Sequence, residues 1–406
     1  MYENIAVISV FAFTYSIVAG GMERTPINGP LVFVAFGLLF GPVGLGILDI
    51  SVDRTGFRII ADLTLALVLF IDAANADLRV LKSQSHIPRR MLLLGLPLVI
   101  GGGMLTGAWL FDEFNLYQLA ILATILAATD AALVKAVVTN KAVPPRIREG
   151  LNAESGFNDG MCVPILFTFV ALAVGAPAEG GNILLALKLV AQEIGIGLVV
   201  GLGLTAIGVQ LVGICIRQGW ISEIWLQVTA VALAVACFAV AQSLHGSGYV
   251  AAFVGGMLFG SLLKSETHRL VHAGEGFAET LALVTWVVFG AAVVGKYYDF
   301  FTWNVLFYAL LSLTAIRILP MLLALAGTGE YMAGKLFLGW FGPRGLASVV
   351  FLIIVLDEKV PGSETMAITV VCTVTLSILM HGLTARPLAN WIAARTKGTA
   401  DDGESA

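Results

Sequence analysis

The chain has 406 residues, of which 58% are hydrophobic and only 12% are charged, and its formal net charge is −4. An average soluble domain carries about 25% charged residues, so this composition excludes a water-soluble enzyme, and the excess of apolar residues excludes a disordered chain. There is no basic block for nucleic acid, and the four cysteines are scattered, so we expect no nucleic-acid partner and no cofactor. The composition predicts an all-α membrane protein.

Apolar stretches of about 20 residues, the length needed to cross a bilayer, recur along the whole chain. We predict thirteen transmembrane helices, with approximate bounds 4–21, 30–47, 57–75, 90–111, 117–138, 147–175, 183–213, 221–244, 246–263, 277–295, 302–327, 334–356 and 365–392. Only short turns separate them. We therefore expect residues 1–395 to form one polytopic transmembrane domain, followed by a short, disordered cytoplasmic tail over 396–406.

Lysine and arginine in the predicted loops indicate the orientation of the chain. If the N-terminus is outside, the loops and the tail assigned to the cytoplasm hold a large excess of these residues over the external loops. Cytoplasmic loops of membrane proteins show the same bias. We therefore expect a prokaryotic cell-membrane protein with its N-terminus outside and its C-terminus in the cytoplasm.

Ionisable residues inside the predicted spans are the candidates for function, because a charge within the bilayer is costly and usually functional. They are Asp72, Asp130, Glu154, Asp159, Arg317 and Arg344, with Asp62, Lys188 and Glu193 as further candidates. The last three are more typical of packing or interface charges, and their role stays open. His245 and His381 are isolated, and we expect neither to have a direct role in transport.

The predicted span over 147–175 contains the sequence ESGFND. Ser155 and Asp159 are four residues apart and share one helical face, while Glu154 and Asn158 share the neighbouring face. A buried carboxylate without a partner is strongly unfavourable. Glu154 therefore needs a cation, which either of the two arginines in the later spans can supply.

Asp130 and Asp159 are the carboxylates that we predict to form the exchange site. Two carboxylates in a low-dielectric cavity repel each other, so a bound cation or proton relieves the repulsion. A hard cation such as Na⁺ prefers oxygen ligands, and carboxylates, a serine hydroxyl and a backbone carbonyl all provide them. One site then holds either a metal cation or protons, which is the minimum that exchange requires.

A helix break is predicted in the span over 334–356, where the sequence is GPRG at 342–345. Proline removes a backbone donor and glycine loosens the helix. The span over 117–138 has no proline at the matching place, only TDA at 129–131. Broken helices at corresponding positions of two halves mark transporter sites near the midplane. We therefore predict inverted repeats whose broken helices, the fifth and twelfth, cross each other.

The motifs Thr129-Asp130, ESGFND and GPRG, in this order, resemble those of the sodium/proton exchanger branch of the monovalent cation:proton antiporters, and of its NhaP-like bacterial and archaeal members. In that family two aspartates bind the ion and the proton, and a serine and a threonine carbonyl help to coordinate. The resemblance therefore implies that Asp130, Asp159, Ser155 and Thr129 bind the ion. It also implies thirteen spans and a homodimer.

The resemblance implies supporting residues too. Asp72, at the end of the third span, is implied to lie near the ion path. Arg317 is implied to pair with Glu154, and Arg344 to stabilise the crossing of the broken helices. Asn158 stands where electrogenic relatives have aspartate, so the chain resembles the electroneutral branch, which exchanges one cation for one proton.

We therefore expect an antiporter that exchanges cytoplasmic Na⁺ or Li⁺ for external H⁺. We do not expect an enzyme. A core bundle around spans 4–6 and 11–13 is expected to move past a scaffold made of the other spans. Ala131 replaces the proline usual in the family, which leaves the unwinding of the fifth span open. The alternatives are a K⁺/H⁺ antiporter with the same carboxylates and a cation channel. An intramembrane aspartyl protease is disfavoured, because its Tyr-Asp and Gly-x-Gly-Asp signatures are absent.

Overall fold

The computed structural model describes residues 2–22, 25, 27–48, 54–76, 86–175, 183–263 and 267–401, and this part of the chain contains helices and no strand. The first half consists of α1 (Tyr2–Met22), α2 (Gly29–Phe40), α3 (Arg54–Asn75), α5 (His86–Arg90), the π-helical turn η1 (Met91–Gly95), α6 (Leu96–Leu110), α7 (Leu116–Ile125), α8 (Ala131–Val138) and α9 (Pro145–Gly175). The second half consists of α10 (Ile183–Arg217), α11 (Glu223–Ser243), α12 (Gly248–Leu263), α13 (Thr267–Val288), the π-helical η2 (Phe289–Val294), α14 (Gly295–Tyr297), the 3₁₀ turn η3 (Tyr298–Phe300), α15 (Trp303–Leu313), α16 (Ala315–Ala324), α17 (Met332–Trp340), α18 (Leu346–Asp357) and α19 (Ser363–Asp401).

Each predicted span coincides with helix in the described part of the chain. Seven helical stretches there are long and apolar enough to cross a membrane: Tyr2–Met22, His86–Leu110, Pro145–Val174, Leu184–Arg217, Leu270–Phe300, Trp303–Ala324 and Ser363–Arg395. Shorter apolar helices are Gly29–Phe40, Leu116–Ile125, Val228–Ser243, Gly248–Leu263 and Leu346–Asp357. The chain is thus a multi-pass helical membrane protein, while the number of thirteen crossings stays a prediction.

Several element ends differ from the sequence prediction, and α13, for example, begins at Thr267 where the predicted span begins at 277. Helix α2 stops at Phe40, well before residue 47, because a series of glycine-containing turns begins at Gly41. Helix α19 continues to Asp401, past the predicted start of the tail at Thr396, and the disorder of the tail stays a prediction. The Arg395 guanidinium lies 4.9 Å from the centre of the Trp391 ring, one turn earlier, and this contact supports the helix just before the predicted tail.

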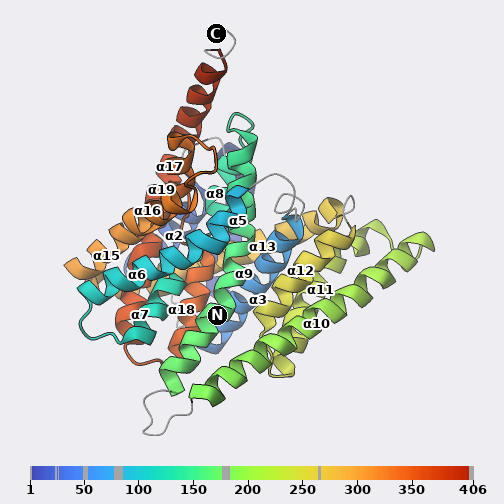
Figure 1. Ribbon diagram of the computed structural model, residues 1–406. Coiled ribbons are helices and arrows are strands. Elements are labelled where there is room, and N and C mark those ends of the chain that lie inside the picture. Colours follow the sequence, from blue (N-terminus) through green and yellow to red (C-terminus); the bar gives the residue numbers. More distant parts are fainter. Residues whose placement is uncertain are drawn as a thin grey trace.

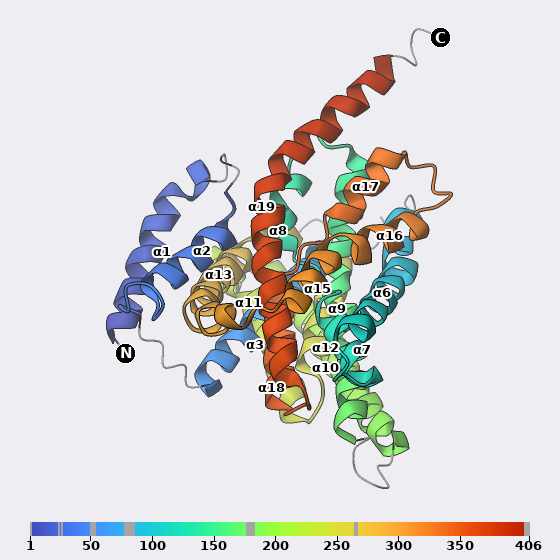
Figure 2. The same ribbon diagram turned by 90° about the vertical axis from the view of Figure 1, so that its left-hand side faces the viewer.

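The helices form two groups that meet along α9. Helices α3, α10, α11, α12 and α13 pack against one another, and α2 packs on α13. Helices α6, α7, α8, α15, α16, α18 and α19 form the other group. Helix α9 contacts α7 and α8 on one side and α3 and α10 on the other (Figure 1). Figure 2 shows α1 and α2 at one edge of the molecule and α6 and α7 at the opposite edge.

Two spans are interrupted in the interior of the protein. Between α7 and α8, residues 126–130 are not helical, and between α17 and α18, residues 341–345 are not helical. All of these residues are buried. The two predicted broken helices are therefore present, and the fifth span unwinds although it contains no proline.

Candidate ion-binding site

The two helix breaks contact each other at Asp130. The backbone N–H of Asp130 donates to the carbonyl of Pro343 at 2.9 Å. Its carboxylate accepts from the N–H of Leu346 at 2.8 Å through Oδ2 and from that of Leu133 at 3.3 Å through Oδ1. Asp130 therefore caps the N-termini of both α18 and α8, and both helix dipoles stabilise its negative charge. A methyl group on Gly345 would overlap this carboxylate, so the approach of the two breaks requires glycine there.

Side chains of α9 satisfy the backbone groups that the first break leaves unpaired. Asn158 Nδ2 donates to the carbonyl of Ala127 at 3.2 Å, and Ser155 Oγ donates to the carbonyl of Thr129 at 3.4 Å. The N–H of Thr129 donates to Asp159 Oδ1 at 3.0 Å. Non-helical backbone is tolerated in a membrane where protein groups replace the lost hydrogen bonds. These contacts explain why the fifth span unwinds without a proline.

Asp159 is the carboxylate with coordinating capacity to spare. It is 6% exposed, and in the described part of the chain it accepts one hydrogen bond, from the N–H of Thr129. The negative charges of Asp130 and Asp72 act on it. Asp130, Asp159, Ser155 and Thr129 are all buried and lie together, as predicted from the sequence. Asp72 is half-buried at the edge of this group.

Glu154 and Arg317 form a buried ion pair beside the two aspartates. Glu154 Oε1 lies 2.9 Å from Arg317 Nη2, and the two side chains are 2% and 1% exposed. The same oxygen accepts from Asn158 Nδ2 at 2.9 Å and from Thr129 Oγ1 at 3.4 Å. The contact of Arg317 Nη2 with Glu154 is short, but its angle does not meet the criterion for a hydrogen bond. The Nε and Nη1 atoms of Arg317 have no hydrogen-bond partner among the described residues. Charge attraction therefore holds the arginine there.

Arg344 ties the second break to its neighbours. Its Nη1 donates to the carbonyl of Gly342 at 3.0 Å, and its Nη2 donates to the carbonyl of Ser312 near the end of α15 at 3.4 Å. Its backbone N–H donates to Ser377 Oγ on α19 at 2.7 Å. Arg344 is therefore placed where it can stabilise the crossing of the two broken helices, and this role stays a prediction.

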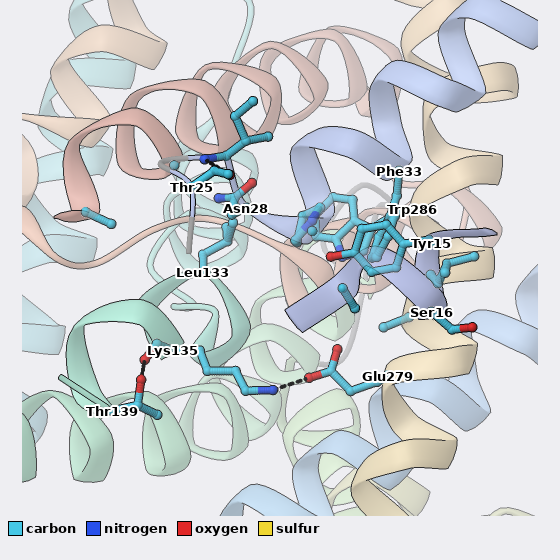
Figure 3. A pocket seen from close by; sticks show the side chains of 18 of the residues that line it. Tyr15, Ser16, Thr25, Asn28, Phe33, Leu133, Lys135, Thr139, Glu279 and Trp286 are labelled. Atoms are coloured by element: carbon cyan, nitrogen blue, oxygen red, sulfur yellow. Dashed lines mark hydrogen bonds and ion pairs between the residues drawn. The ribbon is translucent and has the colours of Figure 1, made fainter. Parts of the chain in front are cut away.

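A cavity of about 930 Å³ adjoins the site between α1, α2, α8, α13 and α19. Aromatic and charged side chains line it, among them Tyr15, Phe33, Trp286, Lys135 and Glu279. Lys135 and Glu279 pair across it at 3.0 Å, joining α8 to α13 (Figure 3). Leu133, which also lines it, has its N–H capped by Asp130. The cavity therefore reaches to within one turn of α8 from the site.

A second cavity of about 550 Å³ lies near the C-terminal end of α9. Arg58 lines it, pairs with Asp357 of α18, and lies 3.5 Å from Asp62. Tyr249 donates to the same Asp62 carboxylate at 2.6 Å. Asp62 thus contacts Arg58 and Tyr249, while its role stays open. Of the other two open candidates, Glu193 lines this cavity and Lys188 is exposed, and their roles stay open.

Buried aromatic side chains separate this second cavity from Asp159. Tyr249 of α12 lines the cavity, and Phe253, one turn further along α12, is in close contact with Gly160. The rings of Phe157 and Phe253 pack edge to face at 6.1 Å. Of the two cavities, the first is the one lined by a residue that bonds to an aspartate of the site, Leu133.

One contact was not foreseen from the sequence. His381 is fully buried, and its Nε2 lies 2.9 Å from the carbonyl oxygen of Trp340 at the start of the second break. The available signal was its spacing of four residues from Ser377 on one helix.

Comparison with known proteins decides the family. The sequence profile described as "Sodium/hydrogen exchanger, transmembrane" matches residues 9–391. The chain belongs to this family. Within the sodium/hydrogen exchanger family, it is 27% identical over 397 residues to the K(+)/H(+) antiporter NhaP of Alkalimonas amylolytica, covering 96% of this chain and 67% of the relative. It is 22% identical to the K(+)/H(+) antiporter NhaP2 of Shewanella sp. (strain ANA-3), covering 87% of this chain and 60% of the relative.

The fold of this exchanger is that of a solved antiporter. The sodium proton antiporter MjNhaP1 from Methanocaldococcus jannaschii, at pH 8, superposes with a TM-score of 0.76 and 21% sequence identity, over 97% of this chain and 99% of the other. The chain thus spans about 60 to 67% of the length of the curated relatives, and nearly all of the solved structure. The predicted fold class and family are confirmed.

Proposed function

We propose that this protein is an electroneutral antiporter that exchanges one Na⁺ or Li⁺ for one H⁺ across the prokaryotic cell membrane. The observation that carries the proposal is the buried Asp159 carboxylate, which has free oxygen lone pairs and lies beside Ser155 and the Thr129 carbonyl. Oxygen ligands suit a hard cation. A proton on the carboxylate removes the charge that holds the cation, so the two compete for one site.

The buried charges around the crossing support one-to-one exchange. The buried aspartate, glutamate and arginine side chains there are Asp130, Asp159, Glu154, Arg317 and Arg344, while Asp72 is half-buried and is not counted. Three are acidic and two are basic, so the ionised set carries one net negative charge. Asn158 adds none. Either one monovalent cation or one proton then makes the buried cluster neutral, which favours movement of both loaded forms through a low-dielectric interior.

Alternating access follows from the two groups of helices. We propose that the bundle containing both breaks, around spans 4–6 and 11–13, moves past the scaffold that includes α3 and α10 to α13. With the N-terminus outside, the larger cavity faces the cytoplasm. The buried rings of Tyr249, Phe253 and Phe157, which we call the aromatic layer, then close the outer side. No residue of α1 is buried, and we propose that the early spans of two copies form a homodimer.

A K⁺/H⁺ antiporter is the second candidate, because the two bacterial relatives compared above are named K(+)/H(+) antiporters. It would use the same carboxylates with a looser site. The two candidates differ in cation choice and share the site.

Proton movement in proteoliposomes separates these functions. Purified protein is reconstituted with an internal pH-sensitive dye, and Na⁺, Li⁺ or K⁺ is added under imposed membrane voltages. We expect Na⁺ and Li⁺ to drive proton movement that does not depend on voltage. Proton movement with K⁺ alone would favour the second candidate, and cation current at fixed pH would indicate a channel and overturn the proposal.

A further inference from the structure

One face of α19 contacts both ends of the second break. Ser377, His381 and Thr384 are spaced so that they share a helical face. Ser377 Oγ accepts from the N–H of Arg344 at 2.7 Å. His381 Nε2 lies 2.9 Å from the carbonyl oxygen of Trp340, and Thr384 Oγ1 accepts from Trp340 Nε1 at 3.1 Å.

Both ring nitrogens of His381 have hydrogen-bond partners. A carbonyl oxygen can only accept, so a hydrogen bond from Nε2 to Trp340 requires the ring hydrogen on Nε2. Nδ1 lies 3.0 Å from the carbonyl oxygen of Ser377 and 3.2 Å from its Oγ. Ser377 Oγ uses a lone pair for the N–H of Arg344, which leaves its own hydrogen for Nδ1, so a ring with its hydrogen on Nε2 has a bond at each nitrogen. A neutral ring thus has both nitrogens satisfied, although it is fully buried.

These contacts fix the part of the break that meets the ion site. Trp340 ends α17, and its carbonyl accepts from Gly342 N–H at 2.9 Å as well as from His381. Arg344 is two residues before Leu346, whose N–H donates to the Asp130 carboxylate. His381 acts directly on one end of the break and, through Ser377, on the other.

We propose that His381 is a positioning residue of the exchanger: it holds the break so that the N-terminus of α18 stays on Asp130 and the cation ligands keep their spacing. It does not touch the ion. This inference rests on the proposed exchange function, and it goes beyond that function by assigning a role to a residue outside the ion site.

The test is cation-dependent proton movement in proteoliposomes for wild type, His381→Leu and His381→Gln. A glutamine amide can still donate to Trp340, whereas leucine cannot. Leucine leaves a buried carbonyl without this donor, which is unfavourable, so we expect His381→Leu to raise the half-saturating Na⁺ concentration about tenfold, equal to about 1.4 kcal/mol. The maximal rate should change less than about twofold, and His381→Gln should return the half-saturating concentration to within about threefold of wild type.

Two further variants test whether the effect comes from the contacts of His381 with the break. Ser377→Ala should shift the half-saturating concentration in the same direction. Thr373→Val is the matched control, because the Thr373 hydroxyl is buried on α19 but bonds only within its own helix, to Thr369 at 2.7 Å. Wild-type saturation behaviour in His381→Leu, or equal defects in the leucine and glutamine variants, would overturn the proposal.

Hydrogen exchange of the amides over 341–349 separates this inference from the exchange function. We expect these amides to exchange faster in His381→Leu than in wild type, and to be protected again in His381→Gln. If the wild type moved no protons, the proposed function would fail, while this measurement would still decide whether His381 holds the break. Unchanged protection in His381→Leu would refute the positioning role.

Discussion

Replacing Glu154 by alanine tests the buried ion pair most directly. The substitution leaves the Arg317 guanidinium, which is 1% exposed, without a counter-charge. It also removes the acceptor of the Thr129 hydroxyl, while Asn158 keeps the carbonyl of Ala127 as an acceptor. Most of the expected effect therefore comes from the unpaired arginine.

The magnitude follows from the burial of the pair. Removing one partner of a buried ion pair costs about 3–5 kcal/mol. Unfolding entropy scales with length at roughly 2.1 cal/mol/K per residue, which is about 0.85 kcal/mol/K for 406 residues. The expected fall in Tm of Glu154→Ala is therefore about 4–6 °C.

Thermal melting in detergent measures this change. The matched control is Glu279→Ala, because Glu279 pairs with Lys135 while its side chain is 54% exposed, and exposed pairs contribute about 0–1 kcal/mol. Adding Arg317→Met to Glu154→Ala should restore most of the lost Tm, since no buried charge then remains unpaired. A wild-type Tm in Glu154→Ala, or a double variant as unstable as the single one, would refute the reasoning.

Three other substitutions test the site and its access. Asn158→Asp adds a carboxylate to the buried cluster, and we expect proton movement in liposomes to become dependent on imposed voltage. Gly345→Ala places a methyl group on the Asp130 carboxylate, and we expect at least about a tenfold loss of transport at saturating cation, since displaced ion ligands can cost that much. Arg58→Gln removes the ion pair with Asp357, and we expect faster labelling, from the outer side, of a cysteine placed behind the aromatic layer.

Each of these substitutions has a control. Gly203→Ala on α10 introduces the same methyl group into open space and should transport as wild type does. Ser155→Cys, which lies on α9 on the side of the aromatic layer away from the second cavity, provides the labelled cysteine with and without Arg58→Gln. Voltage-independent exchange by Asn158→Asp, full activity of Gly345→Ala, or unchanged labelling with Arg58→Gln would contradict the respective explanation.

Much of the fold could be predicted because its signals are local. Long apolar stretches show where the helices are, and Pro343 between two glycines shows where the second break is. The carboxylates stood out because charges are rare inside such stretches. The grouping of Asp130 and Asp159 followed from their motifs.

The remaining features depend on contacts between distant parts of the chain. The first break has no proline, and α9 holds it open through Ser155 and Asn158. Asp130 caps a helix that begins 216 residues further along, and no local pattern predicts such a contact. His381 looked isolated for the same reason, since its partner Trp340 lies 41 residues away.

The central claim is that the Asp159 carboxylate holds either a cation or a proton. Proton release on addition of Na⁺ to the purified protein, in weakly buffered detergent solution, measures this competition directly. We predict about one proton released for each Na⁺ bound by wild type, as one neutralising charge replaces another, and neither binding nor release in a folded Asp159→Asn variant. Na⁺ binding without proton release, or unchanged binding by Asp159→Asn, would contradict the claim.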